Sequence, residues 1–486
     1  MGNATINTPI NEKKVNIPQA LSILGCIVTI MALFAKYKGN TVIALFMSWV
    51  VIYLACAILG IDWNSTFKSA LDGIHSAFGA FIILIFVGAV IGTWIPAGTI
   101  GYVINQGLGM INPKFFLLCT LIICSIMSIF TGTSTGSVAS AGVAMMGIGT
   151  VLGFPIGPTA GAAMCGSLFG DKMSPLSDTT NVAPALTGGN LFKHIRAMLY
   201  TTIIPYIFCL IFFTVLGFRY TNNISTNLSD IEVATSILNA NFKLSIICLL
   251  PLALVIVLLV LKVDVIPALG ASAISGVLIA WLYQGRGLIE TFNMMYSGFT
   301  IRSGNEIVDR LLIRGGMVSM STTVFVMIFA IGMGTMLEKL GVISALVRPF
   351  IDKLDSTIKL ICMAVGVTYG AAALTTTMTG TAVISARVMS PVFKTKGLAP
   401  EMLSRTIEDC GTLGGALIPW HIVAVVFGEF LGASWSQFVL FLPLCYLAPI
   451  MAIVCAVTGW GIWYVDEDGN PIKKEEHKKL YPNAFK

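Results

Sequence analysis

Long apolar runs recur along the whole chain and are separated by short polar segments. A helix needs about 20 apolar residues to cross the hydrocarbon core of a bilayer, and many of these runs approach that length. Examples are Ile17–Ala35, Thr41–Leu59, Ala77–Ile95, Met198–Gly217, Leu244–Leu261, Ala268–Tyr283, Val318–Met336 and Phe438–Tyr464. The pattern predicts an all-α polytopic membrane protein.

Composition supports this class and excludes others. Hydrophobic residues make up 56% of the 486 residues and charged residues only 11%, which is not the usage of a soluble globule. The net charge of +6 is spread over loops without a basic block, so we expect membrane lipid and no nucleic acid as a partner. The first apolar run lacks a small-residue cleavage site and is therefore expected to be a spanning helix.

The chain contains an internal repeat. Thr135-Gly136-Ser137 matches Thr379-Gly380-Thr381 at an offset of 244 residues (379 − 135), and the same offset pairs Gly170 with Gly414 and Pro175 with Pro419. Upstream, Gly98 matches Gly341 at an offset of 243 (341 − 98). Because the matches share one offset, we expect two repeats of inverted topology.

The repeat and the polar segments define the expected organisation. Both termini are polar, the C-terminal one strongly charged, and both are expected to be disordered. The polar stretch 285–315 is expected to form solvated or interfacial helices. We divide the chain into an N-terminal tail (1–16), a first repeat (17–218), a linker (219–242), a second repeat (243–465) and a C-terminal tail (466–486).

In each repeat an apolar segment runs into a tip rich in Gly, Ser and Thr and then out again. The tips are Thr131–Ser137 and Thr375–Thr381. The arms have about 16 residues, which is short for a full crossing. We therefore expect each repeat to contain a re-entrant hairpin whose tip lies near the middle of the membrane.

A second interruption follows each hairpin. The segments Gly170–Asn181 and Thr412–His421 contain Gly, Pro and ionisable residues between apolar flanks. Pro and paired Gly interrupt a helix and free backbone carbonyls and amides. Broken helices at corresponding positions of two repeats are typical of a transporter's binding site.

The side chains at these places favour a hard monovalent cation coupled to protons. Carboxylates, hydroxyls and amides offer the oxygen ligands that sodium prefers, and a buried carboxylate can carry a proton in one state and bind sodium in another. Asp171 and Asp178 are the expected Na⁺ ligands, and Glu408 and Asp409 are expected to match them in the second repeat. The remaining candidates are Ser134, Thr135, Ser137, Ser174, Ser177, Thr179, Asn181, Thr377, Thr379, Thr381, Thr412 and His421.

Structural explanations compete with each of these roles. Buried carboxylates also form ion pairs, and Lys172 offers a partner to either Asp171 or Asp178. Ser and Thr often hold helices together in membranes. His421 is either a hydrogen-bonded core residue or a proton relay. Glu338 and Lys339, at the end of an apolar run, are expected to pair with each other.

Three blocks of the sequence resemble the NhaC-type sodium/proton antiporters, a family of the larger ion transporter superfamily. The first is Gly170-Asp-Lys-Met-Ser-Pro-Leu-Ser-Asp-Thr-Thr-Asn181 with Ala183-Pro184-Ala185. The others are Ile91–Ile100 and Leu403–Thr412, the latter followed by Ile418-Pro419-Trp420. The resemblance covers roughly residues 15–465 and implies two inverted repeats, each with a hairpin and a broken helix.

The resemblance also implies exchange of cytoplasmic sodium for external protons across the cell membrane of a bacterium. A similar branch exchanges malate and protons for lactate and sodium, so a small carboxylate remains an alternative substrate. Arg387 and Arg405 flank the second break and are candidates to attract it. His421 stands where the family more often has Asn.

Other classes fit less well. Gly132-Thr-Ser-Thr-Gly136 satisfies the G-x-S-x-G pattern of serine hydrolases, but the strand-to-helix elbow that this pattern requires is not expected here. A channel is also conceivable, although repeats with broken helices favour alternating access. We expect a transporter rather than an enzyme, with no cofactor, and leave open whether it forms a homodimer.

Overall fold

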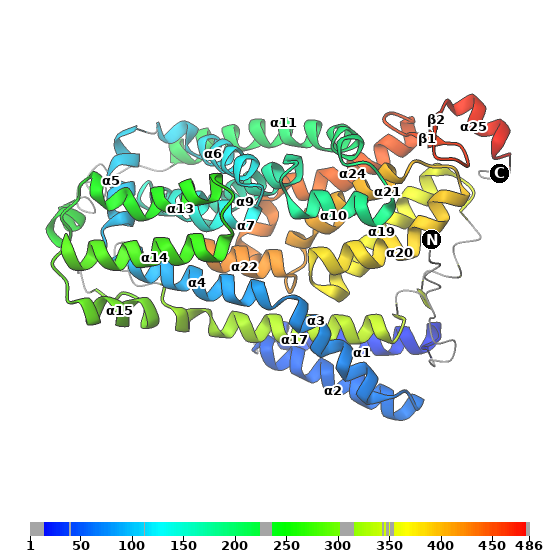
Figure 1. The fold of residues 1–486 in the computed structure, drawn as a ribbon, viewed down its shortest axis with the longest axis horizontal. Helices are drawn as coiled ribbons and strands as arrows, with labels where there is room; N and C mark the ends of the chain where they lie inside the picture. Colours follow the sequence, from blue (N-terminus) through cyan, green and yellow to red (C-terminus); the bar gives the residue numbers. More distant parts are fainter. Residues whose placement is uncertain are drawn as a thin grey trace, which may run out of the picture.

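The computed structural model describes residues 14–482, apart from 38–39, 111, 224–235, 302–314, 343–344, 347–348 and 350–353. Almost all of this part of the chain is helical, as predicted (Figure 1). Among the described residues, seven helices are long and apolar enough to cross a membrane, or up to nine if each of two bent pairs counts as one span. The chain is therefore an all-α polytopic membrane protein.

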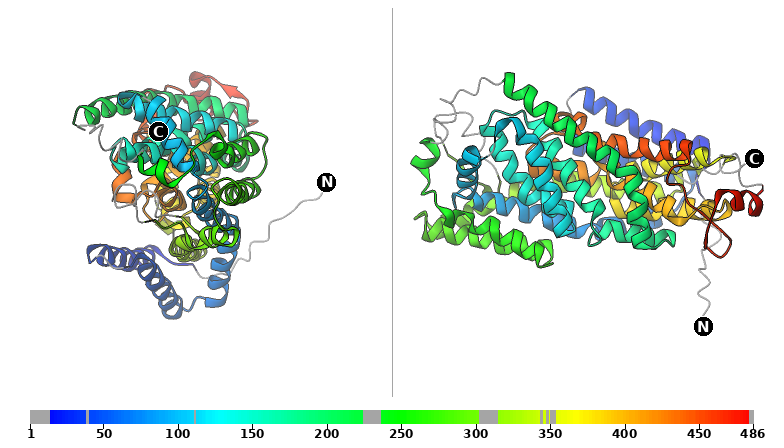
Figure 2. Two further views of the ribbon diagram at one scale, coloured as in Figure 1. Left: turned by 90° about the vertical axis from the view of Figure 1, so that its left-hand side faces the viewer. Right: turned by 90° about the horizontal axis from the view of Figure 1, so that it is seen from above.

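Ten α-helices precede the long helix α11 in the described part of the chain. They are α1 (Ile17–Lys36), α2 (Thr41–Leu59), α3 (Trp63–Ser76), α4 (Phe78–Trp94), α5 (Thr99–Met110), α6 (Phe116–Thr131), α7 (Ser134–Ser137), α8 (Val143–Val151), α9 (Ile156–Met173) and α10 (Asp178–Thr187). A π-helical turn, η2 (Val138–Gly142), joins α7 to α8. Helices α1 and α2 lie at the periphery of the bundle (Figure 2).

A long helix, α11 (Leu191–Asn223), leads into the second half. The helices that follow are α13 (Leu250–Val260), α14 (Val265–Leu282), α15 (Leu288–Ser297), α17 (Ser321–Lys339), α19 (Thr357–Thr375), α20 (Met378–Thr395), α21 (Pro400–Ile407), α22 (Ile422–Leu431), α23 (Trp435–Phe438), α24 (Pro443–Thr458) and α25 (Lys474–Leu480). Short turns of 3-10 or π helix extend them: η1 (Pro113–Phe115), η3 (Ile246–Leu249), η4 (Met317–Met320), η5 (Glu408–Thr412), η6 (Gly414–Leu417) and η7 (Val439–Phe441).

Two turns at the hairpin tips have the same backbone geometry 244 residues apart. Gly132 ends α6 at φ +68°, and Thr376 ends α19 at φ +59°. In each tip the next residue, Thr133 or Thr377, caps the following helix by accepting a hydrogen bond from the amide of Gly136 or Gly380. The first arms, Pro113–Thr131 and Thr357–Thr375, are long enough to cross a membrane. The expectation that these arms are too short was therefore wrong, because the 3 residues of η1 lengthen the first arm and α19 runs the whole length of the second.

The helix breaks also repeat with the offset of 244. Ser177 caps α10 and His421 caps α22, and these helices end at Gly188 and Gly432, both in the left-handed region. Both breaks were predicted, but the first one begins later in the chain than expected. Helix α9 continues through Asp171 and Lys172 to Met173. In the second copy, α21 passes through the π turn η5 before the chain bends by 51° into α22.

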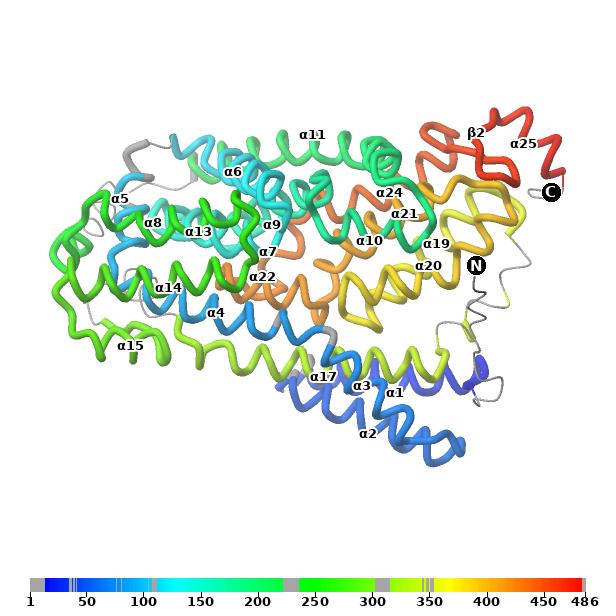
Figure 3. Tube along the Cα trace, viewed as in Figure 1, coloured from blue at the N-terminus to red at the C-terminus, as the bar shows by residue number. Residues whose placement is uncertain are grey.

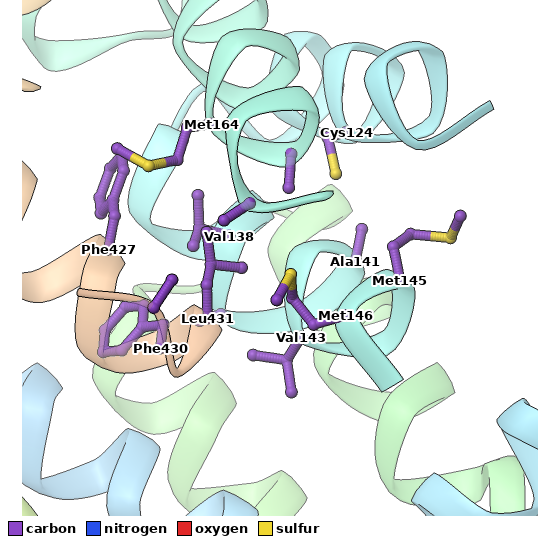
Figure 4. Close-up of a cluster of buried hydrophobic side chains, with 14 of the residues drawn as sticks. Cys124, Val138, Ala141, Val143, Met145, Met146, Met164, Phe427, Phe430 and Leu431 are labelled. Atoms are coloured by element: carbon purple, nitrogen blue, oxygen red, sulfur yellow. The ribbon is translucent and has the colours of Figure 1, made fainter. Parts of the chain in front are cut away.

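Each helix that follows a break packs against the hairpin of the other half. Helix α10 contacts α20, and α22 contacts the π turn η2 of the first hairpin. The second contact is a dense apolar cluster in which Phe427, Phe430 and Leu431 of α22 meet Val138 and Met164 (Figure 4). The two halves are thus interleaved at the centre of the molecule.

The predicted linker and C-terminal tail differ from expectation. Helix α11 extends through the start of the linker to Asn223, while residues 224–235 lie outside the described part of the chain. The C-terminal segment is ordered rather than disordered: β1 (Tyr464–Val465) pairs with β2 (Pro471–Ile472), and α25 follows. This segment docks on the connection between α20 and α21 through the backbone bond from Val465 to Gly397, at the right of Figure 3.

Candidate functional site

A cavity of about 700 Å³ lies where the two tips and the two breaks meet. Both tips reach it, as do the first turns of α10 and α22, the junction of α3 and α4, and one face of α17. Its polar side chains are Thr133, Ser134, Thr135, Asp171, Ser177, Asp178, Thr179, Thr335, Glu338, Thr375, Thr377 and Thr379. Eight of the sixteen candidate residues named from the sequence line this cavity.

Asp171 is the buried carboxylate of this site. It lies in the last turn of α9 and is only 4% exposed. The hydroxyl of Ser134, at the first tip, donates a 2.6 Å hydrogen bond to its Oδ2. The tip and the break of the first half are therefore joined at an acidic group that lines the cavity.

Asp178 differs from Asp171 in its surroundings. It is exposed and occupies the first turn of α10, directly after the cap Ser177. A carboxylate at a helix N-terminus is stabilised by the unpaired amides and the helix dipole. The Ser177 and Thr179 hydroxyls are 3.1 Å apart and lie at the same edge of the cavity.

The second half supplies hydroxyls to the cavity but no aspartate. Thr375, Thr377 and Thr379 line it from the second tip. By the offset of 244, the counterparts of Asp171 and Asp178 are Gly415 and Ile422. The acidic part of the break is thus present in one copy only.

Glu408 and Asp409 do not match the first-half aspartates. Both are buried in the π turn η5, and neither lines the cavity. Asp409 forms a fully buried ion pair with Lys172 and accepts a 3.1 Å hydrogen bond from Thr201. The expectation that Lys172 pairs with Asp171 or Asp178 is therefore wrong, because the lysine points across the interface between the halves.

Six other candidates lie next to the cavity rather than in its wall. Ser137 donates to the carbonyl of Cys124 at 2.8 Å, Ser174 to Ile129 at 2.9 Å, and Thr381 to Thr377 at 2.7 Å. The Asn181 amide donates to Pro175 and Ser177 across the first break. His421 accepts from the amide of Val423 as a helix cap, and Thr412 is buried in η5. In this structure the hydrogen bonds of these side chains stabilise the backbone of the tips and breaks.

The cavity wall carries acidic groups and, among the described residues, no Lys, Arg or His. Arg405 is buried elsewhere and donates to the carbonyl of Gly461, whereas Arg387 is exposed on α20. Glu338 does line the cavity, although the sequence led us to expect only a pair with Lys339. The signal was the spacing of Ile331, Thr335 and Glu338, which places all three on one face of α17.

Several known proteins match this chain. A model of the Na⁺/H⁺ antiporter family matches residues 166–460. The malate-2H⁺/Na⁺-lactate antiporter of Bacillus subtilis (strain 168) is 36% identical over 96% of this chain and 99% of its own length. The Na⁺/H⁺ antiporter NhaC of Alkalihalophilus pseudofirmus is 33% identical over 93% of this chain and 97% of its own. The arginine/ornithine antiporter ArcD of Halobacterium salinarum is 29% identical over 95% and 96%.

Proposed function

This chain belongs to the Na⁺/H⁺ antiporter family, and from that premise we propose that it is a secondary active antiporter exchanging Na⁺ for H⁺. It is a multi-pass protein of the cell membrane. The observation that carries the proposal is the cavity wall, which combines Asp171, Asp178 and Glu338 with hydroxyl groups and, among the described residues, has no basic side chain. Such a wall attracts a small cation and offers it the oxygen ligands that sodium prefers.

Asp171 and Asp178 are the groups that bind the proton and the sodium ion in turn. An ionised carboxylate buried like Asp171 is costly unless a cation or a proton neutralises it. Ser134 orients that carboxylate by its hydrogen bond, and the hydroxyls of both tips supply neutral oxygens around it. Competition of Na⁺ and H⁺ for the same carboxylates would couple their movements.

Alternating access fits an arrangement of two inverted repeats, each with a re-entrant hairpin and a broken helix. The common offset of 244 in tips, caps and helix ends supports it, as does the reciprocal packing of α10 on α20 and of α22 on η2. Such repeats transport by moving one bundle against another around a central site. In the membrane the protein either works alone or forms a homodimer.

A sodium-coupled exchanger of small organic acids is the second candidate. The identity to the malate/lactate antiporter favours it, and a cavity of about 700 Å³ has room for such a substrate. The acidic wall argues against it, because a carboxylate substrate needs a cation as partner and neither Arg387 nor Arg405 lines the cavity. Bound Na⁺ would have to supply that charge.

Inverted membrane vesicles with an acid interior distinguish the two candidates. Sodium is added first, then malate or lactate, while a fluorescent probe reports internal pH. Proton release on sodium alone supports Na⁺/H⁺ exchange, whereas release only with a carboxylate present supports the organic-acid exchanger. Asp178→Asn should abolish exchange while the protein still inserts into the membrane, and full sodium-dependent flux in that variant would refute its role.

A further inference from the structure

One face of α17 forms part of the cavity wall. It presents Ile331, Thr335 and Glu338, spaced at i, i+4 and i+7. With a rise of 1.5 Å per residue, this face runs about 10 Å along the helix axis. It leads from buried Ile331 to the half-buried pair Thr335 and Glu338.

The repeat does not require a carboxylate at this place. Helix α17 is the counterpart of α4 at the offset of 243: Gly98 and Gly341 have φ of +77° and +76° and donate to Ile95 and Glu338 at 2.9 and 2.8 Å. The position equivalent to Glu338 is therefore Ile95, a buried apolar residue. The backbone forms the same turn with either side chain, so the turn does not explain the acid.

Glu338 also has no ion-pair partner among the described residues. Their ion pairs are Lys172–Asp409 and Lys359–Asp355. Arg387 on α20 attracts Glu338 from beyond ion-pair distance. A half-buried carboxylate in a membrane helix is costly, and such groups usually face a pathway for ions.

The hydroxyl of Thr335 is oriented to assist this carboxylate. Thr335 donates its proton to the carbonyls of Ile331 and Gly332, at 3.1 and 3.2 Å. Its oxygen lone pairs are then left for a cation on the cavity side. One turn of α17 thus offers a charged and a neutral oxygen ligand to the same space.

We propose that Glu338, assisted by Thr335, is a cation-binding residue of the transport site. The inference deepens the proposed function and rests on it. Glu338 supplies the acidic ligand of α17, while Asp171 and Asp178 supply those of α9 and α10. Because α17 packs mainly against α2, α3 and α19, and α9 mainly against α6, a cation bound by Glu338 and Asp171 bridges two helices whose main packing partners differ.

Sodium affinity of the purified protein tests this role directly. Thermal unfolding of wild type and of Glu338→Gln is measured in detergent as NaCl replaces choline chloride at constant ionic strength and pH. Binding to the folded state raises the unfolding temperature with ligand concentration, so the midpoint reports affinity without requiring transport. Glu338→Asp tests whether a negative charge at this position suffices for Na⁺ binding. Glu429→Gln is the control, because Glu429 is an exposed residue of α22 outside the cavity.

We expect Glu338→Gln to need roughly tenfold more Na⁺ for the same stabilisation, with an unchanged unfolding temperature in choline. Glu338→Asp should fall between it and wild type, and Glu429→Gln should match wild type. An unaltered Na⁺ midpoint in Glu338→Gln would overturn the inference. A loss of stability in choline in both Glu338→Gln and Glu338→Asp, with the wild-type Na⁺ midpoint in both, would overturn it as well. Proton flux measured on the same variants separates this result from the proposed function: wild type that binds Na⁺ but moves no protons refutes the exchange and leaves the role of Glu338 standing.

Discussion

At the first helix break Ser177 caps α10 and is followed by Asp178, whereas at the second break His421 caps α22 and is followed by Ile422. The cap positions, the turn of the chain and the terminating glycines agree at the offset of 244. The side chains do not agree. The first copy has the acidic Asp178 after its cap, whereas the second copy has a histidine as the cap and the apolar Ile422 after it. The two copies thus share their backbone geometry, while only the first copy carries an acidic side chain at its helix break.

The packing after each break differs in the same way. Phe427 and Phe430 of α22 belong to the buried cluster with the first hairpin (Figure 4). Their counterparts in α10 are Ala183 and Leu186, of which Leu186 is exposed. Helix α22 presents Ile422, Val423, Val426 and Phe427 to the cavity, whereas α10 presents Asp178 and Thr179. The difference teaches that equivalent helices of a near-symmetric fold can line one cavity with apolar side chains on one side and polar side chains on the other.

Removing the charge at the first break should have the largest effect. Asp171→Asn keeps the shape of the side chain but deletes the charge that binds a cation or proton. We expect exchange to fall by about 100-fold or more, corresponding to about 3 kcal/mol or more. Initial rates of sodium-dependent proton flux in proteoliposomes measure it, with Glu429→Gln as control. Wild-type rates in Asp171→Asn would contradict the asymmetry of the two breaks.

The ion pair that joins the two halves should come next. Lys172→Met leaves Asp409 buried and unpaired, which typically costs about 3–5 kcal/mol. Thermal unfolding in detergent should show a clear loss of stability, and Lys172→Met combined with Asp409→Leu should restore most of it. Equal stability of Lys172→Met and wild type would mean that the pair does not hold the halves together.

The hydrogen bond between the first tip and the first break should matter less. Ser134→Ala removes the 2.6 Å bond to Asp171, and bonds to charged groups contribute about 1.5–3 kcal/mol. We expect the apparent Na⁺ affinity to change by about tenfold or more. Ser140→Ala is a matched control, because Ser140 lies on the same hairpin and donates to the carbonyl of Gly136. Identical affinities of both variants would exclude a role of Ser134 in orienting Asp171.

Exchanging the residues at the two tips should give effects of opposite sign. An L-residue in the left-handed region costs about 1–2 kcal/mol, so Thr376→Gly should stabilise the protein and Gly132→Ala should destabilise it. Gly132→Ala also brings a Cβ to 2.8 Å from the Cβ of Leu176. Unfolding temperatures measure both changes. A stabilising Gly132→Ala would show that the tips do not share their geometry.

The smallest expected effect is a pH dependence of the docked C-terminal segment, which has no counterpart among the described residues of the first copy. His477 of α25 is buried against the connection between α20 and α21, beside the carbonyl of Lys396 at 2.8 Å, and burial lowers its pKa from the usual range. Because the docked segment disfavours the protonated ring, docking is most stable above about pH 6.5 and weakens as the pH falls below it. The protection of residues 464–481 against hydrogen exchange, measured relative to an unstructured chain at the same pH, should therefore fall between pH 7.5 and 5.5, and His477→Gln should remove most of this change. Equal pH dependence in the variant would contradict the assignment.

The fold was predictable as far as local rules determine it. Apolar runs predict the spanning helices, and Gly, Pro and hydroxyl clusters predict both tips and both breaks, because these residues act on the backbone beside them. Helix ends were less predictable. Asp171 and Lys172 lie inside α9, although the sequence placed them in a break, because tertiary packing extends the helix beyond its apolar run.

The site was predictable only in part, for a related reason. Asp171, Asp178 and the threonines of the second tip line the cavity, since they lie beside the first break and in the second tip, where the sequence placed its candidates. The pairing of Lys172 with Asp409, 237 residues away, depends on how the halves interleave. Glu338 was missed because its neighbour in sequence, Lys339, offered a simple explanation for its charge, whereas its face of α17 turns to the cavity.

Purified protein in sealed liposomes provides the most direct test that the acidic first break exchanges sodium for protons. Uptake of radioactive sodium is followed into liposomes that are acid inside and contain no organic acid, for wild type, Asp171→Asn and Glu429→Gln. We predict that wild type and Glu429→Gln take up sodium as internal protons leave, and that Asp171→Asn does neither. Sodium uptake without proton release, or uptake in Asp171→Asn at the wild-type rate, would contradict the proposed exchange at this site.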